Sequence, residues 1–126
     1  YNLFSGPGPL TDFTRSLAYV DDLNVDKVFP AHEHIFDDLH ARVQDILVHH
    51  DKRNAVILAT LNDGPLTGYE IASRIPWDVP DTTWETMLTS DKRSATCETL
   101  AHLEYMRKEG KVTSSSDNGL NLYRQI

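Results

Sequence analysis

The sequence predicts a mainly α-helical protein that ends in a β-hairpin. Two observations carry this prediction. Apolar residues recur at helical spacing over several separate stretches, and residues 111–126 hold two short strand-like runs about Asn118-Gly119. The chain has 126 residues, of which 40% are hydrophobic and 25% are charged. This length and composition suit one soluble domain with a modest core, or one small domain plus a fragment.

Charge and cysteine content exclude several classes of protein. The formal net charge of −7 argues against a general binder of nucleic acid or anionic membranes, which needs a basic face. The single cysteine, Cys97, excludes an internal disulfide and a cysteine-based zinc cluster. No membrane-length apolar run and no signal peptide are visible, so we expect a cytoplasmic protein. The first residue is Tyr1, not Met, which suggests a processed product or a cut piece.

The first third resembles a unit cut from an α/β sheet. Residues 1–9 hold the breakers Gly6-Pro7-Gly8-Pro9 and are predicted as a loop. A helix is predicted over 10–23, and a short buried strand over 25–29, which Pro30 ends. His32 and His34 follow directly, where sites lie past the carboxyl ends of strands. One helix and one strand cannot make a sheet, so we expect residues 1–34 to be the edge of a larger domain.

Residues 35–126 predict three helices and the hairpin. The first helix covers 35–62, and its 55–61 half is expected to be buried because it is apolar nearly all round. Thr67 and Glu70 form a capping box that opens a short helix ending near Pro76. A loop follows over 76–90, then a helix over 92–109 that Gly110 ends. This order is the winged-helix arrangement, with 111–126 as the wing.

His32 and His34 are the first candidates for chemistry. Imidazoles two residues apart can point into one site, and histidine is a common ligand for zinc or iron. A tight site needs three or four ligands, so a pair of exposed loop histidines without a metal is the alternative. For the other chemistry-bearing residues we expect packing or solvation: Cys97 as a small buried side chain, and His40, His49, His50 and His102 without a role.

The charged residues of the helix predicted over 92–109 indicate whether the protein binds nucleic acid. Lys92 and Arg93 open it, but Glu98 and Glu104 follow on the face that would read DNA. Two carboxylates there would repel phosphate. We therefore expect no nucleic-acid partner and a helix face that serves contacts with protein.

The segment VDKVFPAHE, residues 25–33, resembles the last histidine motif of metallo-β-lactamase-fold hydrolases. In that family a strand ends in a Pro-small-His turn, and the resemblance implies that His32 is a metal ligand. The preceding helix, with Ser16 and Leu17, is also similar. Four later segments are similar, in order, to the winged-helix domain appended to many of these hydrolases: 50–53, 64–72, 98–104 and 110–112.

The resemblance implies a function for a longer protein. The main metal motif of the family, H-x-H-x-D-H, should lie upstream, since Phe36 stands where its aspartate would be in the segment from His32 to Asp37. The chain then comprises a remnant of the catalytic domain at 1–34 and a winged helix at 35–126. The intact enzyme would use zinc or iron and a metal-bound hydroxide to hydrolyse an ester, thioester or phosphoester. The fragment alone would be inactive.

The partners implied are the rest of the catalytic domain or, as an alternative, a second copy of the chain. The 76–90 loop carries Trp77 and Trp84, our candidates for contact with the active-site mouth or a subunit interface. A second resemblance stays open. Residues 55–75, with the core GPLTGYEIA, are similar to the first two helices of PadR-like winged-helix regulators, which bind DNA.

Overall fold

The computed structural model describes residues 8–126 and confirms the mainly α class. Of the loop predicted at 1–9, residues 1–7 lie outside this range. The described part contains these elements: α1 (Pro9–Asp21), α2 (Leu39–Thr60), β1 (Leu66–Thr67), α3 (Gly68–Arg74), α4 (Thr89–Lys108), β2 (Val112–Asp117) and β3 (Leu120–Gln125). None of its helices is long and apolar enough to cross a membrane.

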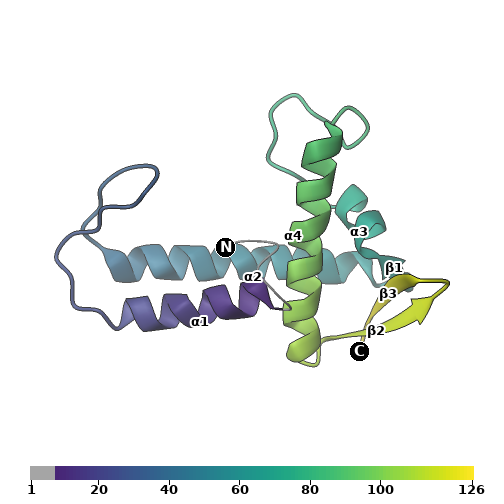
Figure 1. The fold of residues 1–126 in the computed structure, drawn as a ribbon, viewed down its shortest axis with the longest axis horizontal. Helices are drawn as coiled ribbons and strands as arrows, with labels where there is room; N and C mark the ends of the chain where they lie inside the picture. Colours follow the sequence, from purple (N-terminus) through teal and green to yellow (C-terminus); the bar gives the residue numbers. More distant parts are fainter. Residues whose placement is uncertain (1–7) are drawn as a thin grey trace.

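Helix α2 organises the molecule. Helix α1 packs along it, and α4 crosses both helices (Figure 1). The segment 22–38 joins α1 to α2 at the end of the pair away from α4 (Figure 1). The small sheet and α3 lie near the other end of α2 (Figure 1). The two ends of α2 therefore carry different parts of the chain.

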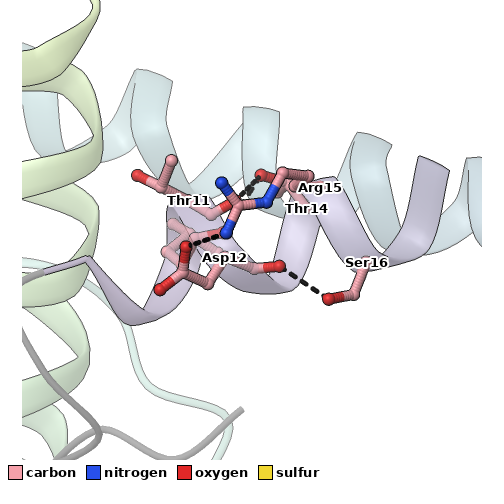
Figure 2. A network of polar contacts seen from close by, with 6 residues as sticks. Thr11, Asp12, Thr14, Arg15 and Ser16 are labelled. Carbon is pink, nitrogen blue, oxygen red and sulfur yellow. Dashed lines mark hydrogen bonds and ion pairs between the residues drawn. The ribbon is translucent and has the colours of Figure 1, made fainter. Parts of the chain in front are cut away.

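Apolar contacts hold α1 in place. Leu10 is fully buried, and the ring of Phe13 lies edge-on to the ring of His50 on α2, with centroids 5.7 Å apart. The polar contacts near the start of α1 stay within the helix, as Figure 2 shows: Arg15 donates to Asp12 at 2.6 Å. At the far end, His40 on α2 pairs with Asp21 at 2.9 Å.

The strand predicted over 25–29 is wrong. Only Val28 pairs there, in a single antiparallel bridge with Phe36. A strand needs a neighbour along its whole length, and in the described residues the only backbone paired with Val28 is the returning segment of the same loop. This bridge and the cap at Asp38 also explain why α2 begins at Leu39 and not at residue 35. The Asp38 carboxylate accepts from Ala41 N at 2.8 Å.

The expectation that residues 55–61 are buried is wrong in part. Ile57 and Leu61 are buried, but Ala55, Val56 and Ala59 are exposed. Helices α1 and α4 both contact α2 and leave a long face of it open to solvent.

One core joins α2, α3, α4 and the sheet. It contains Ile57, Leu61, Ile71, Ile75, Leu103, Met106, Val112 and Tyr123. The capping box is confirmed: Thr67 Oγ1 accepts from Glu70 N, and Glu70 accepts from Thr67 N at 2.8 Å. Helix α4 begins three residues earlier than predicted. It ends as predicted at Gly110, whose φ of 72° allows Lys111 N to bond Met106 O.

The predicted hairpin is confirmed. Strands β2 and β3 pair from Val112 opposite Gln125 to Asp117 opposite Leu120. Asn118 and Gly119 both have positive φ, which a tight turn of this length requires. The sheet also has a strand that we did not predict. The two-residue β1 pairs with β3, so the order is β1-β3-β2.

Candidate functional site

The segment between α1 and α2 presents His32 and His34. Both side chains are exposed. Between them, Glu33 has a φ of 70°, in the left-handed region that favours glycine, and its carboxylate lies 3.4 Å from the Arg42 guanidinium. A second ion pair, between Lys27 and Asp37 at 3.5 Å, spans the loop. The turn therefore holds the two imidazoles on the outside of the molecule.

The residues present do not make a complete metal site. No group of three or more His, Cys, Asp and Glu in residues 8–126 is placed to hold a metal ion. A hollow of about 540 Å³ beside the segment is lined by Asp21, Asp22, Asp37, Asp38 and His40. Three of these carboxylates are already engaged: Asp21 with His40, Asp37 with Lys27, and Asp38 as the cap of α2. His32 could therefore supply at most one ligand to a metal held by other groups.

The same segment exposes large apolar side chains. Phe29 is 73% exposed and Ile35 is 57% exposed, and both lie close to His32 in the chain. Leu23 and Val25 are exposed in the same loop, and Tyr19 is exposed on the last turns of α1. We call this set the His32 face. Several exposed large apolar side chains within one short segment are typical of a surface that another protein part covers.

A different histidine, buried inside the protein, has a strongly lowered pKa. His102 on α4 is fully buried, and its Nδ1 lies 2.7 Å from Asn54 Oδ1 on α2. Since that oxygen can only accept, Nδ1 carries the proton. Nε2 then has no hydrogen-bond partner among the described residues. Burial, and then the nearby His50 and Arg53, lower the pKa of His102 from 6.5 to about 3.

Nothing in the sequence pattern indicated this cluster, because Asn54 and His102 are 48 residues apart. His50, whose pKa burial also lowers, lies with its ring centroid 5.3 Å from that of His102. We expected these histidines to be packed or solvated, and the structure packs both. The cluster joins α2 to α4 and, through Phe13, to α1. This geometry is that of a structural junction inside the protein.

The loop predicted over 76–90 covers residues 75–88 in the structure, between α3 and α4, and holds its two tryptophans differently. The Trp77 indole N–H donates to Ala72 O at 2.8 Å, and the Arg53 guanidinium lies 4.6 Å from the ring centroid. Trp77 therefore fastens the loop to the body. The Trp84 ring lies edge-on to Tyr69 on α3, with centroids 5.4 Å apart. Both tryptophans are half-buried.

Two expectations on α4 need correction. Cys97 is half-exposed and lines a surface hollow, because it lies on a face of α4 that the other helices do not cover. Glu98 does not face outward as a free carboxylate. It lies 3.8 Å from the Arg53 guanidinium of α2, and Glu104 lies 2.8 Å from Arg107. These pairs reduce the negative charge that the helix presents to a partner.

Solved structures of other proteins contain a region with a similar fold. No family model matches the sequence, and no curated protein matches it. Among solved structures, the chain is similar to a metallo-β-lactamase family protein from Thermus thermophilus. Its TM-score is 0.74 and its identity is 30%, and the match covers 98% of this chain and 35% of that one. It is also similar to a β-lactamase domain protein from Burkholderia ambifaria, with a TM-score of 0.76, 22% identity and coverage of 94% and 34%. The chain thus spans about a third of the length of each protein, and its fold is that of a region found in metallo-β-lactamase family proteins.

Proposed function

We propose that this chain is the accessory region of a metal-dependent hydrolase of the metallo-β-lactamase superfamily. In this proposal residues 1–34 complete the catalytic domain, and residues 35–126 form a winged-helix unit that shapes the active-site mouth or a subunit interface. The observation that carries it is the His32 face, where exposed Phe29 and Ile35 lie close to a histidine that lacks further metal ligands in the described part of the chain. Such a surface fits against the remaining two thirds of a protein like its structural neighbours.

The winged-helix assignment has support from topology. The order α2-β1-α3-α4-β2-β3, with the strands arranged β1-β3-β2, gives a three-helix body with a hairpin at one side. In the helix-turn-helix pair of this arrangement, α3 would be the first helix and α4 the second. Helix α1 also packs on α2 and α4, so the proposed boundary at residue 34 separates chain segments that lie close in space.

Zinc or iron is the metal that this proposal implies. The described residues offer it one ligand, His32, and the others would come from the rest of the catalytic domain. The part of this chain in the chemistry is then to hold one imidazole at a fixed place. The positive φ of Glu33 and its contact with Arg42 set the turn that does so.

The test begins with the coding sequence upstream of Tyr1. If it encodes a longer protein, His32→Ala and His34→Ala should be made in that protein, with metal content and ester or thioester hydrolysis measured. Loss of His32 should lower activity by more than the roughly 10–100-fold that loss of an outer-shell partner costs. His34→Ala, two residues away and equally exposed, is the matched control. The proposal fails if the two variants behave alike, or if the 126-residue chain alone shows metal-dependent turnover.

Trp84 is the better of the two tryptophans for testing the mouth contact. Trp77→Ala would also break the bond to Ala72 and the Arg53 contact, so a loss of turnover could reflect unfolding of the loop. Trp84→Ala should change the KM or the assembly of the intact enzyme, while the free energy of unfolding should fall less than it does in Trp77→Ala. Unaltered kinetics and assembly would remove Trp84 from the proposal.

A further inference from the structure

The turn of the hairpin carries Asn118-Gly119, the one Asn-Gly pair in the sequence. Both residues are exposed and have positive φ, 48° for Asn118 and 82° for Gly119. They lie at the tip of the β2–β3 hairpin, which projects from the body of the molecule (Figure 1). Every residue from 114 to 121 is exposed, so this tip lies in solvent.

An asparagine followed by glycine can undergo a reaction that other following residues hinder. The main-chain N of the glycine attacks the asparagine Cγ and forms a cyclic succinimide, while ammonia leaves. A water molecule then opens the ring at either of its carbonyl groups, which gives an aspartyl or an isoaspartyl residue. Glycine favours the attack because it has no side chain to shield its N and because its backbone is flexible.

The structure leaves the reacting atoms accessible. A Cβ built on Gly119 meets nothing within 4 Å among the described residues, so no side chain crowds the attacking N. The strand pairs end at Asp117 opposite Leu120, so the Gly119 N–H is not part of the ladder. Bringing this N to the Asn118 Cγ requires rotation of the Asn118 backbone, which opens the turn. The pairs next to the tip join exposed residues, and such pairs open locally at a lower cost than global unfolding.

We propose that Asn118 is a modification site, at which the folded protein loses a side-chain amide with age and gains a carboxylate. This inference is independent of the proposed hydrolase role. The product is one charge more negative than the net −7 of the sequence, and the new carboxylate lies next to Asp117 in the chain. The isoaspartyl form also lengthens the main chain of a two-residue turn, which sets the register of the hairpin.

The modification would act on the core through β3. That strand pairs with β1 as well as with β2, and its Tyr123 is 2% exposed in the core. Val112, at the end of the hairpin away from the turn, belongs to the same core. A lengthened turn therefore loosens a hairpin on which the core depends. The aged chain should unfold at a lower urea concentration than the fresh chain.

The experiment is to incubate the full chain in its folded state at neutral and at mildly alkaline pH, and to follow each asparagine by peptide mapping and mass spectrometry. Asn118 should convert to a mixture of aspartyl and isoaspartyl products. The conversion should be faster at the higher pH, because the attacking N reacts after losing its proton. Asn121 is the internal control, since it is exposed in the same hairpin but precedes Leu122. It should keep its amide while most of Asn118 converts.

Asn118→Gly is the control variant, because Gly-Gly also suits a turn with two positive φ angles. On isoelectric focusing the parent sequence should accumulate an acidic form, and the variant should not. The proposal is overturned if Asn118 keeps its amide as long as Asn121 does, or if it converts only in urea. It is also overturned if Asn118→Gly forms the acidic species as fast as the parent sequence. Equal urea midpoints for the aged and fresh chains would overturn the effect on the core.

Discussion

Mild acid should destabilise this protein through the buried side chain of His102. Burial lowers the pKa of His102 to about 3, whereas the same side chain in an unfolded chain titrates near 6.5. Between those two values the unfolded state binds more protons than the folded state. The stability is therefore fully present above pH 6.5 and is lost as the pH falls below it. For this one group, the free energy of unfolding should drop by about 2 kcal/mol between roughly pH 7 and pH 5.

Urea denaturation of the full chain, followed by far-UV circular dichroism at several pH values in that range, measures this loss. The perturbation is His102→Gln, which removes the titration and keeps an amide that can still pair with Asn54. We expect this variant to be less stable near neutral pH, because the buried ring is lost. Its further loss on acidification over the same range should be smaller than that of the unmodified protein by about 2 kcal/mol.

His34→Gln is the control, since His34 is exposed in the 22–38 loop. It should lose stability with acid as the unmodified protein does. A residual acid loss in the His102 variant is expected from His50, whose pKa burial lowers in the same direction. Equal acid losses in the unmodified protein and the His102 variant would refute the reasoning, because they would show that His102 is not held neutral in the fold.

Three further predictions concern stability, and urea midpoints measure each. Leu10→Ala should cost about 2–5 kcal/mol, because Leu10 is fully buried where α1 docks; a change near zero would show that α1 is not docked. Thr67→Ala should cost about 1 kcal/mol by removing the capping box, and an unchanged midpoint would contradict that role. Gly110→Ala should cost about 1–2 kcal/mol through its φ of 72° alone, since open space surrounds the added methyl; Ser115→Ala, exposed in the hairpin, should change little.

The elements that were predicted correctly from the sequence are specified by residues close together in the chain. Thr67 and Glu70 form their capping box across three residues, and Asn118-Gly119 turns the hairpin by its own backbone preference. Gly110 ends α4 for a similar local reason. Such signals do not depend on the rest of the fold.

The features that could not be predicted depend on distant partners. The apolar run 25–29 has the composition of a strand, but Val28 finds one partner residue in the described part of the chain. The strand β1 has only two residues and exists because β3 lies beside it. The pairing of Asn54 with His102 joins two helices, and neither residue is unusual in its own helix. The assignment of His32 as a metal ligand rests on local sequence alone. The described residues do not supply the other ligands that the metal would need.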